Sequence, residues 1–243
     1  MFVIPLEVDN PTRHKPFVLI GIVLVNVTIF TIVKLLFDPH KIFLEYGFVP
    51  AHFSWLTIVS SMFLHGGVWH LLGNMVFLGM FGDNIEDVVG GLMMAIAYAL
   101  CGLAATASYL AVHPGSTIPC VGASGAISGM AGMYLTFFPK TKTELCVYVF
   151  RWEVDRIPAT AIGAIGTWFG EQAVLALVIE LTALGGIVRV GFSAHVGGFL
   201  MGCLLGVLFL QLGFVRRYRT DGKRHWLLGH MPGRVAAQLR ANP

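Results

Sequence analysis

The sequence is poor in charged side chains. Only 12% of its 243 residues are Asp, Glu, Lys or Arg, whereas soluble domains carry about 25%. The few charges stand in short blocks between long apolar runs, and 56% of the residues are hydrophobic. This segregation excludes an ordinary soluble domain and is typical of a chain that crosses a membrane several times.

Cysteine is also scarce, and the four cysteines (Cys101, Cys120, Cys146 and Cys203) show neither CxxC nor metal-ligand spacing. Only Cys120 falls in a loop that we expect to lie outside the membrane. The pattern therefore argues against a disulfide framework. The sequence also has no internal repeat and no low-complexity segment, so we expect one membrane domain.

Six apolar segments predict an all-α fold, a polytopic bundle of six transmembrane helices. They cover residues 17–37, 68–81, 92–112, 122–138, 158–184 and 192–213. The first is too long for the apolar part of a signal peptide, so we expect it to remain as an anchor. The predicted organisation is an N-terminal segment (1–16), the membrane domain (17–213) and a basic tail (214–243).

The distribution of positive charge predicts the orientation. If the N-terminus is cytoplasmic, thirteen of the sixteen Lys and Arg residues lie on the cytoplasmic side. The positive-inside rule then places both termini in the cytoplasm. The basic tail is suited to lie on anionic lipid headgroups, although it also fits a solvated end of the chain.

Four polar side chains share one expected depth. The second segment carries His70 and Asn74 in its first two turns, the fourth begins beside Ser124, and the sixth has His195 about one turn in. All three segments run inward, so a rise of 1.5 Å per residue puts the four within roughly ten Å of the outer surface. Polar groups at membrane depth are costly and mark candidate functional sites.

Small residues at helical spacing mark one face on two of these segments. They are Ser124, Ser128 and Gly132 on the fourth segment, and Gly198, Gly202 and Gly206 below His195 on the sixth. If the two faces meet, Ser124 and His195 come together. A neighbouring histidine can then take the proton of the serine hydroxyl and make it a nucleophile.

On the same reasoning, His70 and Asn74 stand i, i+4 on one helix face and suit an oxyanion hole, helped by the backbone N–H of Ser124. Each residue also has a simpler interpretation. A GxSG motif often only packs helices, a histidine near a helix end often bonds a carbonyl, and Asn74 can tie two helices together.

Other polar residues leave two interpretations open. His65 precedes the second segment and fits a structural loop residue better than a catalytic one. Glu171 and Glu180 lie in the fifth segment and suit either a proton relay or a structural contact. The acidic group at 83–87 suggests a solvated loop with a capping role.

At these residues the chain resembles the rhomboid family of intramembrane proteases. The segment from His65 through His70 to Asn74 is similar to the family's HxxxxHxxxN signature. Gly122-Ala-Ser124-Gly resembles its GxSG motif, and Ala-His195-Val-Gly-Gly resembles its AHxxG motif. The three stand in the family's order on the second, fourth and sixth segments.

The resemblance implies a six-helix bundle around a water-filled cavity that opens to the outer side. It implies Ser124 as nucleophile, His195 as general base, and His70 and Asn74 in the oxyanion hole, with no metal and no cofactor. Substrates would be single-span membrane proteins cut near the outer surface. We expect membrane lipids as the other partners and no nucleic acid, and the sequence indicates no oligomeric state.

The chain departs from the family pattern at two places. The first external loop has no Trp-Arg pair, and Ser128 stands where some members carry an aromatic ring one turn after the nucleophile. We hypothesise that the Ser128 hydroxyl, or water that it holds, helps to orient His195. Gly122, Ser128 and His65 are thus candidate supporting residues.

Two other functions compete with a protease. One is an inactive relative that binds transmembrane helices in quality control, although such relatives usually lack the serine or the histidine. The other is a small transporter, which would show inverted repeats and polar groups near mid-membrane. The size of the chain and the absence of a targeting extension favour a prokaryotic plasma membrane.

Overall fold

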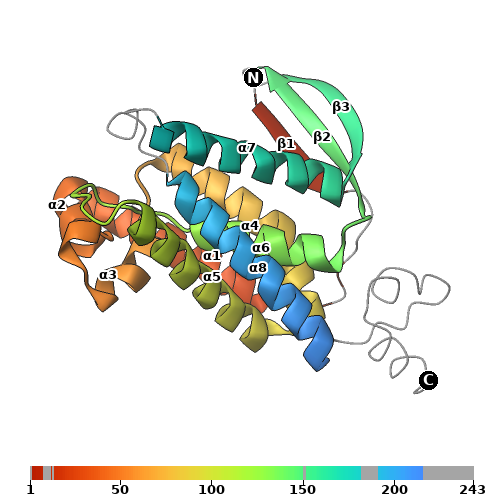
Figure 1. The fold of residues 1–243 in the computed structure, drawn as a ribbon, viewed down its shortest axis with the longest axis horizontal. Coiled ribbons are helices and arrows are strands. Elements are labelled where there is room, and N and C mark those ends of the chain that lie inside the picture. Colours follow the sequence, from red (N-terminus) through yellow and green to blue (C-terminus); the bar gives the residue numbers. More distant parts are fainter. Residues whose placement is uncertain (1, 8–11, 13, 150–151, 182–190, 216–243) are drawn as a thin grey trace.

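The structure is a computed structural model that describes residues 2–7, 12, 14–149, 152–181 and 191–215. Six long helices form the bundle in Figure 1, one at each predicted segment. They are α1 (Phe17–Leu36), α4 (Val68–Val89), α5 (Gly91–Val112), α6 (Ser124–Phe137), α7 (Ala161–Leu181) and α8 (Phe192–Leu212). The predicted helical membrane bundle is confirmed. The tail lies outside the described residues from 216 onward, and the predicted domain boundaries stay predictions.

Four or five of the described helical segments have the length and composition of membrane spans. Within the described residues, α1, α5, α7 and α8 are each long and apolar enough to cross a membrane. The pair formed by residues 55–63 and α4 makes a fifth candidate, bent by 88°. Helix α6 has 14 residues, about 21 Å at 1.5 Å per residue, which is shorter than a hydrocarbon core of about 30 Å. Six spans therefore stay a prediction.

The bundle is built around close contact between α6 and α8, which cross the centre of Figure 1. A Cβ atom at Gly198 would overlap the carbonyl of Gly125, and one at Gly202 would overlap Gly129. Large apolar side chains face outward instead, with Leu204 61% exposed. Because lipid solvates such side chains as well as a protein core does, helices in a membrane associate through small residues that allow close packing.

The contact confirms part of the predicted packing between the two small-residue faces and corrects the rest. The small-residue face of α8 meets α6 as expected, with Gly206 against Thr136. On α6, Gly132 of the predicted face also meets α8, since a Cβ atom there would overlap the carbonyl of Phe199. Nearer the site, however, the residues in backbone contact are Gly125 and Gly129 rather than Ser124 and Ser128. Small residues occupy both neighbouring faces of α6, so their spacing alone does not identify the face that meets α8.

A small antiparallel sheet is the part of the fold that the all-α prediction did not contain. Strand β1 (Phe2–Glu7) pairs with β2 (Lys142–Val149), which pairs with β3 (Trp152–Thr160). The sheet therefore joins the segment before α1 to the connection between α6 and α7. These two segments therefore lie at the same end of the bundle. The side of the membrane that this end faces stays a prediction.

The opposite end of the bundle carries short helices. They are α2 (Pro39–Tyr46), η1 (Pro50–His52), α3 (Trp55–Ser60) and η2 (Ser61–Phe63). Phe48 and Cys120 exchange two backbone hydrogen bonds of 3.0 and 2.8 Å, and the N–H of Gly122 donates to the carbonyl of Ser61 at 2.9 Å. These bonds fix the segment that leads into Ser124. Figure 1 shows α2 and α3 far from the sheet.

The acidic group at 83–87 lies in the last turns of α4 and not in a solvated loop. Glu86 is buried, and its carboxylate accepts hydrogen bonds from the backbone N–H groups of Val18 (3.0 Å) and Leu19 (2.8 Å). Asp87 accepts from the backbone N–H of His14 at 3.0 Å and lies 2.7 Å from its ring. Since the first N–H groups of a helix lack partners within it, Glu86 caps α1 from another helix.

Candidate active site

The first residue of α6 and the first turn of α8 meet at one point. Nε2 of His195 lies 2.9 Å from Oγ of Ser124. Ser124 is half-buried, and its backbone N–H is at the N-terminus of α6. The contact follows from the packing of Gly198 against Gly125. Gly125 is the residue after Ser124, and Gly198 lies about one turn after His195. The arrangement gives a hydroxyl a base at hydrogen-bonding distance.

Helix α7 contacts the imidazole of His195 both at Nδ1 and on the ring face. Nδ1 of His195 lies 2.7 Å from Oε1 of Gln172, and Gln172 is 8% exposed. Trp168, one turn earlier on α7, stacks on the ring with centroids 6.4 Å apart. The sequence analysis missed both residues. The available signal was an amide at the centre of an apolar segment, beside Glu171.

The contact with Oε1 of Gln172 favours one tautomer of a neutral His195. An amide oxygen only accepts hydrogen bonds, so Nδ1 carries the hydrogen and donates it to Gln172. Nε2 then presents its lone pair to the Ser124 hydroxyl, which donates the hydrogen bond. This is the tautomer that a general base for Ser124 requires.

His70 and Asn74 lie on the first two turns of α4, as the spacing predicted. The backbone N–H of Gly66 donates to Nδ1 of His70 at 3.3 Å, so in the neutral ring Nε2 carries the hydrogen. His70 is exposed. Among the described residues, the buried Nδ2 of Asn74 has no hydrogen-bond partner. Both side chains thus have an N–H group to offer.

Gly122 joins the two parts of the site. Its φ of +132° lies in a region that favours glycine, and a Cβ atom there would come within 2.9 Å of Cε1 and Nε2 of His70. The same Cβ would be 3.7 Å from Oγ of Ser124. The imidazole of His70 and the hydroxyl of Ser124 therefore flank one small residue, which must remain small.

His65 and Ser128 support this site less directly. His65 is buried and packs its ring against that of His70, with centroids 5.2 Å apart. The hydroxyl of Ser128 donates to the carbonyl of Ser124 at 2.7 Å, within α6. The polar partner of His195 is Gln172 and not Ser128. The hypothesis that Ser128 orients His195 thus gains no direct contact.

Cys120 shows why a nearby thiol is a poor competitor for Ser124. It lies in the loop before α6, and burial raises the pKa of its thiol to about 11. A thiol is nucleophilic as the thiolate, so Cys120 is unreactive near neutral pH.

The two glutamates of the fifth segment lie on α7. Glu171 is exposed. The side chain of Glu180 lies outside the described residues, so its two interpretations stay open. The exposed position of Glu171 separates it from the buried neighbour Gln172, which points to His195.

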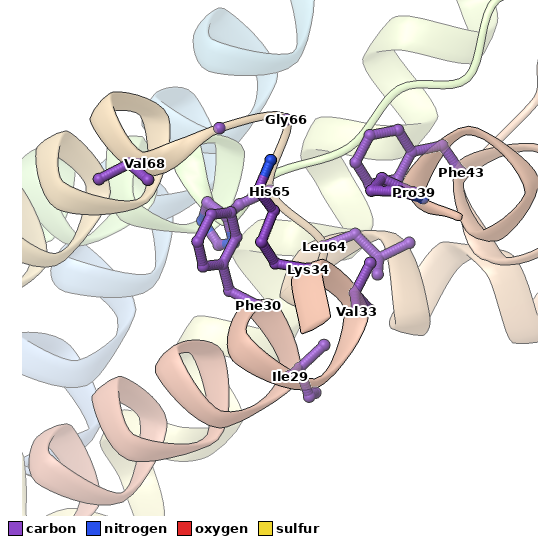
Figure 2. A pocket seen from close by; sticks show the side chains of 11 residues that line it. Ile29, Phe30, Val33, Lys34, Pro39, Phe43, Leu64, His65, Gly66 and Val68 are labelled. Atoms are coloured by element: carbon purple, nitrogen blue, oxygen red, sulfur yellow. The ribbon is translucent and has the colours of Figure 1, made fainter. Parts of the chain in front are cut away.

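A cavity of about 130 Å³ lies beside the site, between α1, α2 and residues 64–68. Figure 2 shows Phe30 and Lys34 of α1 next to His65 and Gly66. Ser124, His195 and Asn74 are not among its lining residues. Two lining residues contact His70: the ring of His65 packs against its ring, and the N–H of Gly66 donates to its Nδ1.

The sequence matches known proteins over most of the bundle. A family model described as the Rhomboid domain matches residues 52–212. The chain is 33% identical to RHOMBOID-like protein 5 of Arabidopsis thaliana over 65% of this chain and 46% of that protein. For RHOMBOID-like protein 2 of the same plant the values are 32%, 67% and 44%. For the mitochondrial Rhomboid protein 1 of Saccharomyces cerevisiae they are 30%, 63% and 41%. The matches thus span less than half of each relative.

Proposed function

Since the chain belongs to the rhomboid family, we propose that it is an intramembrane serine endopeptidase that works through Ser124 and His195. The observation that carries the proposal is the 2.9 Å distance between Nε2 of His195 and Oγ of Ser124. Helices of the bundle hold both groups, and the partner on Nδ1 leaves the Nε2 lone pair for the hydroxyl. The dyad contains no carboxylate.

In the proposed reaction, Oγ of Ser124 attacks the carbonyl carbon of the scissile peptide bond while its proton passes to Nε2 of His195. The imidazolium then gives this proton to the leaving amine as the C–N bond breaks, which leaves an ester on Ser124. Water then attacks the ester carbonyl while His195 takes its proton, and His195 gives that proton to Oγ of Ser124 as the ester C–O bond breaks and the acid is released. His195 returns to its neutral form at the end of each half.

The negative charge on the carbonyl oxygen needs donors that are already in place. We assign this role to Nδ2 of Asn74, Nε2 of His70 and the backbone N–H of Ser124. The absence of a partner for the buried Nδ2 of Asn74 among the described residues supports the assignment. A buried N–H without a partner is costly, and an oxyanion would repay that cost in the transition state.

The proposed substrates are single-span membrane proteins, cut near the outer surface with both termini of the enzyme in the cytoplasm. The site is at the end of the bundle opposite the sheet, and the positive-inside rule assigns that end to the outer side. A prokaryotic plasma membrane stays a prediction, because the relatives above come from a plant and a yeast.

A serine-directed fluorophosphonate tests the proposal. The protein in mild detergent, with its Ser124→Ala and His195→Ala variants, is treated with the probe and examined by intact mass spectrometry. Cleavage of a generic transmembrane substrate is followed in parallel. We expect one adduct on Ser124 in the wild type, and neither adduct nor cleavage in the variants.

Thermal unfolding in the same detergent shows whether each variant is folded. A folded wild-type protein that gives neither adduct nor cleavage would overturn the proposal and favour the inactive helix-binding relative. Cleavage that persists in Ser124→Ala would place the nucleophile elsewhere.

A further inference from the structure

Gln172 contacts the proposed base, His195, through a polar atom and not only through packing. The two side chains come from different helices, 23 positions apart, and their polar atoms are 2.7 Å apart. Gln172 is more than nine-tenths buried, so its amide is shielded from water. A buried amide whose oxygen bonds the proposed base can determine the orientation and the protonated nitrogen of that base.

We propose that Gln172 is a positioning residue that fixes the tautomer and the orientation of His195. The inference rests on the proposed function. Oε1 of Gln172 accepts the hydrogen of Nδ1, which leaves the lone pair on Nε2 and directs it at Ser124. When His195 takes the serine proton, the same oxygen bonds the imidazolium. Gln172 thereby completes a three-membered chain from α6 through α8 to α7.

A neutral amide suits this position in a membrane. A carboxylate would stabilise the imidazolium more strongly, but a buried charge without a permanent partner is costly when the base is neutral. The amide oxygen accepts the same hydrogen bond from Nδ1 of His195, and burying a neutral amide costs less free energy than burying a carboxylate. Among the described residues, His70 is a titratable side chain whose charge, when it is protonated, would act on His195.

Two side chains of helix α7 contact the imidazole of His195. Trp168 and Gln172 are four residues apart and therefore project from one face of the helix. The indole stacks on the ring at an interplanar angle of 30°, while the amide bonds its edge. The position of α7 thus determines how the base is presented to Ser124.

A purely structural role, in which Gln172 only ties α7 to α8, makes a different prediction. It would change the stability of the bundle and leave the catalytic rate of the folded protein unaltered. The proposed role changes the rate and its pH dependence. The variants Gln172→Leu and Gln172→Glu separate the two, with Gln211→Leu as a matched control at an exposed site on α8.

We expect Gln172→Leu to lower kcat by about 10²-fold or more with little change in KM, because a base in the wrong tautomer is inactive. Gln172→Glu keeps an acceptor and should restore much of the rate. Because a carboxylate favours the imidazolium, the acidic limb of its kcat/KM profile moves to higher pH. Gln211→Leu should match the wild type in both readouts.

A second readout does not depend on turnover. In protein labelled with ¹⁵N-histidine, with the His195 signals assigned by comparison with His195→Ala, Nδ1 should be the protonated nitrogen near neutral pH. In Gln172→Leu that preference should be lost.

Normal kcat and an unshifted pH profile in folded Gln172→Leu, or a wild-type His195 protonated on Nε2, would overturn the inference. If Ser124→Ala abolishes cleavage while Gln172→Leu does not, only this inference fails. If the wild type does not cleave at all, the proposed function fails, and the NMR result still decides whether Gln172 sets the tautomer.

Discussion

Gly129 and Gly202 meet backbone to backbone: a Cβ atom on Gly202 would overlap the carbonyl group of Gly129. One turn closer to the active site, Gly198 meets Gly125 in the same way. These contacts set the separation of α6 and α8, and Ser124 and His195 stand at the end of that contact. The dyad distance is thus a consequence of helix packing.

Gly202→Ala should therefore cost stability and activity together. The added methyl group has no space, so the two helices must separate, and we expect a loss of about 2 kcal/mol or more in the free energy of unfolding. Thermal unfolding and substrate cleavage in detergent measure both effects.

Gly79→Ala on α4 is the control for this substitution, since a Cβ atom there would have nothing within 4 Å. It should leave stability unchanged or raise it by up to about 1 kcal/mol, because alanine favours a helix. Equal stability of the two variants would contradict the packing argument.

The sequence predicted the helices of the bundle well because long apolar runs have few other structures. It also predicted that Ser124 and His195 meet, since the two residues share one expected depth in the membrane and each stands at the end of a face of small residues. It missed Gln172, because nothing in a single sequence shows which face of α7 turns toward α8. It missed the sheet, because the pairing of β1 with β2 joins segments more than a hundred residues apart.

Asn74→Ala should reduce kcat by about 10²- to 10³-fold with little change in KM, as loss of an oxyanion donor does. His70→Ala should behave alike. The controlled comparison is Asn26→Ala, which removes a buried Asn whose amide bonds the carbonyl of Ile22 within α1. That variant should lose stability while its folded fraction keeps its kcat. A normal kcat in folded Asn74→Ala would remove Asn74 from the oxyanion hole.

Ser128→Ala should keep most of its activity. The hydroxyl bonds the carbonyl of Ser124 inside α6, and such a bond contributes about 1 kcal/mol or less. Since His195 has its polar partner in Gln172, we expect kcat within about threefold of the wild type. Initial rates measured beside those of Gln172→Leu give the comparison. A Ser128→Ala loss as large as that of Gln172→Leu would restore the hypothesis that Ser128 orients the base.

Glu86 offers a test of stability without chemistry, because it lies at the end of α4 far from Ser124 along the bundle. Its two carboxylate oxygens serve two N–H groups of α1. Glu86→Ala leaves both without this partner, and we expect a loss of about 1–3 kcal/mol in the free energy of unfolding. Glu86→Gln keeps one acceptor oxygen and should fall between the alanine variant and the wild type.

The exposed Glu171 provides the control for that series, and Glu171→Ala should unfold like the wild type, within about 0.5 kcal/mol. Thermal unfolding orders the four proteins, and cleavage per folded molecule should be the same in all of them. If Glu86→Ala unfolds like Glu171→Ala, water replaces the carboxylate at no cost and the cap does not hold α1. If Glu86→Ala instead lowers kcat of the folded protein, a displacement of α1 affects the active site through His65 and the residues that line the cavity.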